Sequence, residues 1–339
     1  MLEAERLRVA RDRIHAALAF QRPDRIPVIY HPSPAGLLLH GERLLELFNR
    51  FPPDNPIRFT GIDRPPADAV DSQGRYHEIK TDTWGTEWEY LAFGLWGSIT
   101  RYPISNWEDA DAFVFPPSSD SFSIAAPDGG FTILGWVSIF EKLCSLSPMD
   151  EVFVGLIDRD ANLMAFLDRL TAYWAESIAR MIRAGADAIM FGDDWGTQQA
   201  PMVAPELFRS IFKPRYDLLM EPIRQAGIKI FFHSCGTLGA ILPDLIDLGI
   251  DCLWPQLPLF EQRPEQFALC SDAGVSLYLH PDRQYLVPRG TPQEIEATVR
   301  AYAERYHKLG GGGLFYVEIE NDAPFENVEA LITAIDRYR

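Results

Sequence analysis

The chain has 339 residues, of which 47% are hydrophobic and 23% are charged. These proportions are typical of globular proteins and exclude a disordered, collagen-like or coiled-coil chain. Its 31 basic and 48 acidic side chains give a net charge of −17. Phosphate backbones and anionic lipid surfaces repel such a chain, so we expect no nucleic-acid or membrane partner.

Four cysteines in a chain of this length do not form a disulfide framework, and they indicate a reducing, cytoplasmic compartment. The first 20 residues are charged throughout and lack the apolar segment of a signal peptide. No apolar run reaches the roughly 18 residues that a membrane-spanning helix needs. We therefore expect a cytoplasmic enzyme.

The first third of the chain is rich in proline and is hard to assign to regular elements. A short strand is predicted at 26–30, followed by a long insertion over 32–125. Within this insertion, residues 82–104 interleave aromatic and polar side chains, a pattern that favours a hairpin over a helix.

From about residue 130 onward, short apolar runs alternate with longer helical stretches. The runs are near-continuous in hydrophobic residues, which is typical of parallel strands that are buried on both faces. We predict these strands at 131–136, 188–193, 228–233, 251–256, 275–280 and 313–320.

With the strand at 26–30 and a possible one at 57–62, the chain would contain eight βα units. That number predicts a TIM-type (β/α)8 barrel with an elaborated N-terminal insertion. An open doubly wound sheet is the rival fold, but no Gly-x-Gly-x-x-Gly follows any predicted strand.

Polar side chains gather where the predicted strands end, and in a barrel these ends form the active-site mouth. They are His31, Asp193, Asp194, Trp195, His233, Cys235, Gln256, His280, Glu318 and Glu320.

The sharpest signal among them is His233-x-Cys235. Two residues apart beyond a strand, an imidazole and a thiolate can point the same way, and both are ligands that suit zinc. Glu318, with Glu320 as the alternative, is the expected third ligand from the last strand. The other reading is that His233 and Cys235 are polar packing at a strand end.

The remaining candidates have two readings each. One of Asp193 and Asp194 is expected to cap the turn that follows, while the pair can also supply a catalytic carboxylate beside the metal. His31, His280, Gln256 and Trp195 are candidates for contacting substrate. His31, His280 and Gln256 can instead simply satisfy backbone groups at the mouth.

Five segments of the chain resemble the uroporphyrinogen decarboxylase superfamily. They are RVARDRIHAALAFQRPDRIPV (8–28), GADAIMFGDDWGTQ (185–198), APELFRSIFKPRY (204–216), HSCGTLGAILPDLIDLGIDCLWPQ (233–256) and GTPQEIEATVRAYAERYHKLGGGG (290–313). The resemblance covers nearly the whole chain and implies a single TIM-barrel domain over 1–339.

Two chemistries occur within this superfamily. True decarboxylases grip the substrate carboxylates with an arginine-rich motif after the first strand, whereas residues 29–42 here contain no arginine. The zinc-dependent corrinoid methyltransferases carry a His-x-Cys that His233 and Cys235 match. Their later ligand is often a cysteine, in place of which this chain offers Glu318 or Glu320.

The resemblance to this branch implies zinc and a partner corrinoid protein. In the mechanism that it suggests, zinc lowers the pKa of an acceptor thiol, which takes a methyl group from the corrinoid. A folate acceptor is an open alternative, and a homodimer is possible. The rival functions are a metal-free porphyrinogen decarboxylase, with Asp193 or Asp194 stabilising a protonated pyrrole, and a non-catalytic corrinoid or porphyrin binder.

Overall fold

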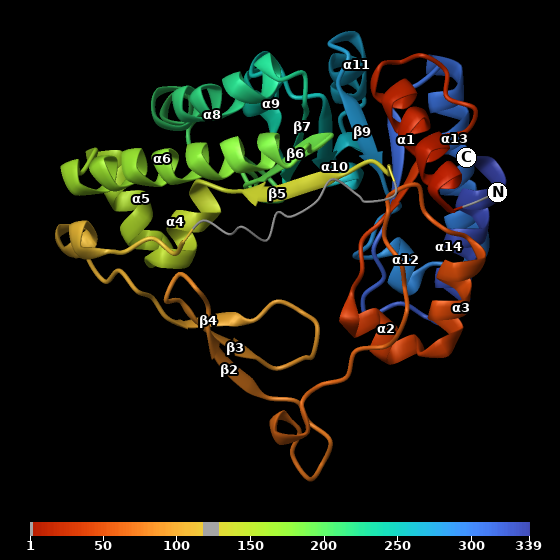
Figure 1. Ribbon diagram of the computed structural model, residues 1–339, viewed down its shortest axis with the longest axis horizontal. Coiled ribbons are helices and arrows are strands. Elements are labelled where there is room, and N and C mark those ends of the chain that lie inside the picture. The colour runs from red at the N-terminus through yellow and green to blue at the C-terminus, as the bar shows by residue number, and fades with distance from the viewer. Residues whose placement is uncertain (1–2, 118–128) are drawn as a thin grey trace.

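The computed structural model describes residues 3–117 and 129–339. Its main body is a parallel sheet whose seven strands are ordered β1-β10-β9-β8-β7-β6-β5 (Figure 1). The strands are β1 (Val28–Tyr30), β5 (Ile133–Val137), β6 (Ala188–Gly192), β7 (Lys229–Ser234), β8 (Cys252–Pro255), β9 (Ser276–Leu279) and β10 (Gly313–Val317).

Helices follow the strands along the chain and cover the outside of this sheet (Figure 1). They are α1 (Glu3–Leu18), α2 (Pro34–His40), α3 (Glu42–Arg50), α4 (Phe140–Leu146), α5 (Met149–Asp158), α6 (Ala161–Arg183), α7 (Pro205–Leu207), α8 (Lys213–Gln225), α9 (Leu242–Asp247), α10 (Leu257–Glu261), α11 (Glu265–Asp272), α12 (Leu286–Arg289), α13 (Pro292–Leu309) and α14 (Phe325–Tyr338). No helix in the described part of the chain is long and apolar enough to cross a membrane.

Two separate apolar clusters show that the sheet is strongly curved. The larger cluster lies between the strands and the surrounding helices. The smaller one takes side chains from all seven strands, including Ile29 of the edge strand β1 and Ile133 of the opposite edge strand β5. Ile14 and Leu18 of α1 belong to the same inner cluster. The sheet therefore wraps around its own core like a barrel, with α1 packed into it.

The prediction of an α/β fold built on a parallel, barrel-like sheet is confirmed, but in the described residues this sheet has seven strands instead of eight. Residues 57–62, the possible eighth strand, form no strand. The free edge of β1 is instead hydrogen-bonded by the loop that follows α3. The Asn55 side chain accepts from the backbone N–H of Tyr30 and donates to its carbonyl, and Asp54 exchanges hydrogen bonds with Val28. These contacts satisfy the backbone groups that an eighth strand would pair.

The N-terminal region contributes a second, smaller sheet that projects from the body (Figure 1). It consists of the antiparallel strands β2 (Glu78–Thr81), β3 (Glu87–Tyr90) and β4 (Ser98–Arg101). The hairpin predicted over 82–104 corresponds to β3 and β4. Trp84 anchors the projection against Tyr173 and Trp174 of α6. Of the insertion predicted over 32–125, residues 118–125 lie outside the described residues.

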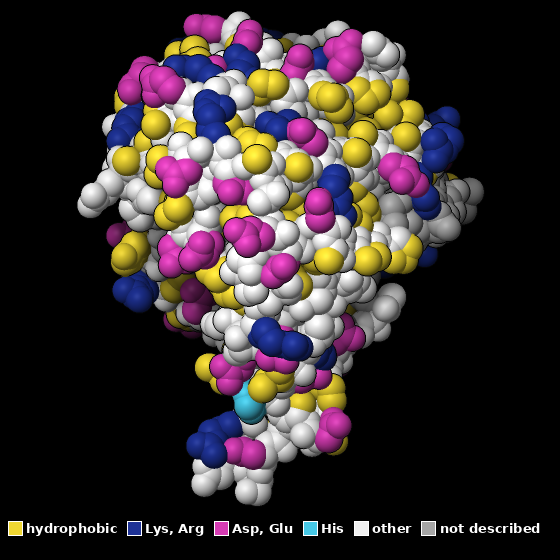
Figure 2. All heavy atoms as spheres, turned by 90° about the vertical axis from the view of Figure 1, so that its left-hand side faces the viewer, with side chains coloured by type: hydrophobic (Ala, Val, Ile, Leu, Met, Phe, Trp, Pro, Cys, Tyr) yellow, Lys and Arg dark blue, Asp and Glu magenta, His cyan; other side chains and the backbone are white. Residues whose placement is uncertain are grey.

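Acidic and basic side chains are interspersed over the face of the molecule seen in Figure 2. The small sheet forms the narrow extension below the rounded body in the same view. On this face the excess negative charge is therefore not gathered into a single acidic patch.

Candidate metal centre

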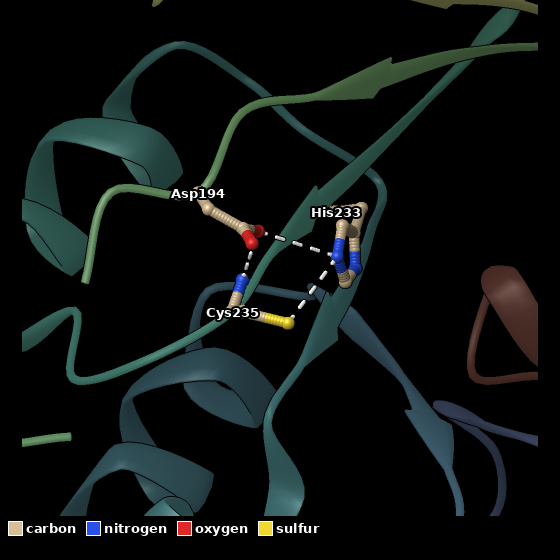
Figure 3. Close-up of side chains that lie close together, drawn as sticks. All are labelled: Asp194, His233 and Cys235. Carbon is tan, nitrogen blue, oxygen red and sulfur yellow. Dashed lines mark hydrogen bonds and ion pairs between the residues drawn. The ribbon is translucent and has the colours of Figure 1, made fainter. Parts of the chain in front are cut away.

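The neighbouring strands β6 and β7 run parallel, with Gly192 opposite His233. Parallel strands bring their carboxyl ends to the same edge of a sheet. Asp194, two residues beyond β6, therefore reaches the side chains of His233 and Cys235 at the end of β7. Figure 3 shows the three side chains converging from these two strand ends.

The three side chains lie close enough to bind one metal ion. Their potential ligand atoms all lie within 4.8 Å of one another. The Nε2 atom of His233 is 3.4 Å from Asp194 Oδ1 and 3.5 Å from Cys235 Sγ. The backbone N–H of Cys235 donates to Asp194 Oδ1 at 2.7 Å, which fixes the carboxylate beside the thiol.

A hydrogen bond at Nδ1 fixes the orientation of the His233 imidazole. Its Nδ1 lies 3.0 Å from the carbonyl oxygen of Trp254. Because a carbonyl oxygen only accepts, Nδ1 carries a proton, and Nε2 is the ring atom that faces Asp194 and Cys235. Histidines that bind metals are commonly held by such a bond at the other ring nitrogen.

The electrostatics of the cluster favour a bound cation. Burial raises the pKa of Asp194, but the facing His233 ring and the Cys235 N–H outweigh it, so that this pKa lies below its usual value. Burial and the Asp194 carboxylate raise the pKa of Cys235 to about 12. A divalent cation between the two side chains would reverse this effect on the thiol. One nitrogen, one sulfur and one oxygen donor form a set that suits zinc.

The adjacent Asp193 has a different environment. It is fully buried and accepts hydrogen bonds from Ser138 Oγ at 2.8 Å and from the backbone N–H groups of Ile139 and Glu141 at 2.7 Å each. The Tyr216 hydroxyl also donates to it. Asp193 thus ties the beginning of α4 to β6 and α8, in place of the expected cap on the turn that follows it.

Glu318 and Glu320 lie outside the three-residue cluster. Glu318 forms an ion pair with Arg283 and accepts from the Tyr316 hydroxyl at 3.2 Å. Glu320 is exposed. The structure therefore brings Asp194, rather than either glutamate, to His233 and Cys235.

The other sequence candidates are divided between the mouth and the core. His31 is exposed after β1, and the Gln256 amide lies beside Gly236. His280 is buried, with Nε2 3.0 Å from the Pro255 carbonyl oxygen and Nδ1 3.2 Å from that of Pro281. Burial and the nearby Arg283 charge lower the pKa of His280 to about 4.

Trp195 packs on the outer side of the sheet. Its ring contacts Phe140, Phe208 and Phe212 at centroid distances of 4.7–4.9 Å, and its exposed fraction is 0%. It has no free surface with which to contact a substrate.

Two further side chains flank the cluster and were not predicted. Glu141, at the start of α4, is held between Asp193 and Asp194, and burial together with these two carboxylates raises its pKa to about 9. Trp136 of β5 lies 5.5 Å from the His233 ring. The only sequence signal for Trp136 is the glycine that precedes it inside a strand, which often marks a bulge.

Comparison with known protein families identifies the family of this chain. The family model described as uroporphyrinogen decarboxylase (URO-D) matches residues 140–338. The chain belongs to this family. A curated uroporphyrinogen decarboxylase from Thermus thermophilus is 26% identical over 174 residues, which are 50% of this chain and 47% of that protein. The chain thus matches about half the length of this curated relative.

A solved structure resembles the chain over nearly its whole length. It is a methyltransferase from Methanosarcina mazei, with 19% identity, a TM-score of 0.63, and coverage of 97% of this chain and 98% of that one. At this identity the likeness demonstrates a shared fold. The shared fold therefore includes the part of the chain that precedes residue 140.

Proposed function

We propose that the protein is a zinc-dependent methyltransferase that moves a methyl group from a partner corrinoid protein to a thiol or folate acceptor. The observation that carries this proposal is the cluster of Asp194, His233 and Cys235 at the barrel mouth. The methyltransferase fold shared with the Methanosarcina structure supports it. A metal-free decarboxylase would have no need for a thiol in this position.

In this proposal Asp194, His233 and Cys235 hold the metal. Bound zinc would supply a Lewis acid that lowers the pKa of an acceptor at its open position. The Trp254 carbonyl keeps His233 in the tautomer that binds through Nε2. The backbone N–H of Cys235 keeps the Asp194 carboxylate turned toward the site.

Glu141 supplies a carboxyl group beside the cluster. It lies beside Asp194 and interacts with its backbone N–H, and burial favours its neutral form. Such a carboxyl group keeps its proton near neutral pH and can donate a hydrogen bond to a group bound at the site.

Porphyrinogen decarboxylation is the second candidate, because both the family model and the Thermus relative are named for it. An arginine near the mouth would be needed to hold the substrate carboxylates. Arg283 is present there, but Glu318 already neutralises its charge. This pairing makes the mouth a poor site for a substrate with many carboxylates.

Metal content and methyl transfer test the proposal together. Untagged wild-type protein is expected to hold about one zinc ion per chain. Cys235→Ala should lose both the zinc and methyl transfer from methylcobalamin, whereas Cys270→Ala, which removes a buried thiol from α11, should keep both. Zinc-free, well-folded wild type that converts a porphyrinogen in the presence of a chelator would establish the decarboxylase instead.

A further inference from the structure

A large aromatic side chain is exposed beside the metal cluster. Trp136 is 44% exposed, although it belongs to a strand of the central sheet. Its ring centroid lies 5.5 Å from that of His233 and 6.2 Å from that of Trp254, with the two indoles nearly perpendicular. Trp136 therefore presents an apolar ring face to solvent beside the His233 ring, where a planar ligand can stack.

A β-bulge turns Trp136 toward the site. The pairing of β5 with β6 shifts register between Leu134 and Val137. Gly135, inside the bulge, has a φ of +80°, and a Cβ there would lie 2.7 Å from the sulfur of Met181. The backbone of β5 therefore departs from regular strand geometry at the point where this indole is placed. Such bulges often re-aim a side chain beside an active site.

The neighbouring strand β6 leaves space for the indole of Trp136. A Cβ on Gly192 would lie 2.2 Å from the six-membered ring of Trp136. The indole thus rests on the bare backbone of β6, two residues before Asp194. Two glycines on neighbouring strands together hold an exposed ring next to the cluster.

Three glutamine amides form a neutral rim on the other side of the cluster. Gln256 Oε1 is 3.0 Å from Gln198 Nε2, and Gln256 Nε2 is 3.4 Å from Gln284 Oε1. Gln256 Oε1 also accepts from the N–H of Gly236, the residue after Cys235. Each amide can both donate and accept, and a planar ligand edge with alternating donors and acceptors can replace these mutual bonds.

We infer, on the basis of the proposed function, that the acceptor is a neutral planar nitrogen heterocycle of the pterin type, with Trp136 stacking on its face and Gln198, Gln256 and Gln284 bonding its edge. A small alkyl thiol would leave both the indole face and the amide rim unused. In the strand order of the sheet, the cluster at the ends of β6 and β7 lies between Trp136 of β5 and Gln256, which follows β8.

The binding of three probes, measured by calorimetry, distinguishes a heterocyclic acceptor from a thiol acceptor. The probes are 6-methylpterin, methoxybenzene (a ring without the amide edge) and 2-mercaptoethanol, each with zinc-loaded and with chelated full-length protein. We expect 6-methylpterin to bind both forms, because neither the indole nor the amides require the metal.

Two sets of variants test the face and the edge. Trp136→Ala should weaken 6-methylpterin binding by about tenfold, the usual loss for a removed stacking partner. If the alanine variant folds poorly, Trp136→Leu, which keeps apolar bulk, should weaken 6-methylpterin binding to a similar extent. Gln198→Leu combined with Gln284→Leu should weaken 6-methylpterin about fivefold and leave methoxybenzene unchanged. Leu218→Ala, at an exposed position of α8, is the matched control.

Two results would overturn the inference. One is binding of 2-mercaptoethanol to the zinc-loaded protein with no binding of 6-methylpterin to either form. The other is unchanged 6-methylpterin binding in both folded Trp136 variants. Absence of zinc with intact, Trp136-dependent pterin binding would instead count against the proposed metal chemistry alone, so the two failures are distinguishable.

Discussion

The Nδ1 atom of His233 lies 3.0 Å from the carbonyl oxygen of Trp254, the residue opposite it on the next strand. The bond is built into the sheet register, since it joins a side chain of β7 to the backbone of β8. It leaves Nε2 facing Asp194 and Cys235. The candidate metal site is therefore prepared by the fold before any ion arrives.

The first prediction concerns which carboxylate binds the metal. Asp194→Asn should weaken zinc binding at least about tenfold, because it removes the anionic oxygen that faces Nε2 and Sγ. Glu318→Gln should leave zinc affinity nearly unchanged, since Glu318 is paired with Arg283. Competition with a chromogenic chelator measures both. The opposite ranking would mean that the last strand supplies the third ligand.

The second prediction separates the two adjacent aspartates. Asp193→Ala should lower the free energy of unfolding by about 3–5 kcal/mol, because it leaves several buried donors without an acceptor. Asp194→Ala should cost far less stability. Chemical denaturation of both variants measures the difference. Equal stability losses would contradict a purely anchoring role for Asp193.

Much of the sheet could be read from the sequence. Buried parallel strands are continuous apolar runs, so β6, β7, β8, β9 and β10 were predictable from hydrophobicity alone. The missing eighth strand was not, because Asn55 replaces its hydrogen bonds with a side chain. Strand propensity and hydrophobic periodicity do not reveal that a side chain will take over the hydrogen bonds of a missing strand.

The candidate site was predictable only where its residues are close in sequence. His233 and Cys235 are separated by one residue, and the spacing itself indicates a shared ligand. Whether Asp194 or Glu318 is the third ligand depends on Arg283. The tertiary fold brings Arg283 into an ion pair with Glu318, and the sequence does not show this pairing. Trp136 escaped prediction because a bulge reverses the alternation that assigns strand residues to faces.

The third prediction tests the role of Trp195. Its fully buried ring packs among Phe140, Phe208 and Phe212, so Trp195→Ala should destabilise the protein by about 3–5 kcal/mol. Trp195→Phe should cost clearly less, because it keeps much of the packing. Thermal melts of the two variants give these values. A change in KM with normal stability would instead indicate a contact with substrate.

The last prediction is a pH dependence at the amino end of the barrel. Asp187 accepts from Arg11 at 2.6 Å and from the Thr132 backbone N–H at 2.9 Å, which ties α1 to the strands. Burial raises its pKa, but the bonds from His15 and Arg11 outweigh burial and lower it from 3.8 to about 2. Because the folded-state pKa is depressed, this carboxylate stabilises the fold above the unfolded-state value and loses that effect as the pH falls.

Asp187→Asn should therefore cost about 2 kcal/mol at pH 7. The difference from wild type should shrink between about pH 5 and pH 2, where the wild-type carboxylate becomes protonated. Urea denaturation at several pH values measures it. Asp272→Asn, at the end of α11, is a control that should behave like wild type throughout. A destabilisation that stays constant down to pH 2 would show that Asp187 acts through packing instead of through its charge.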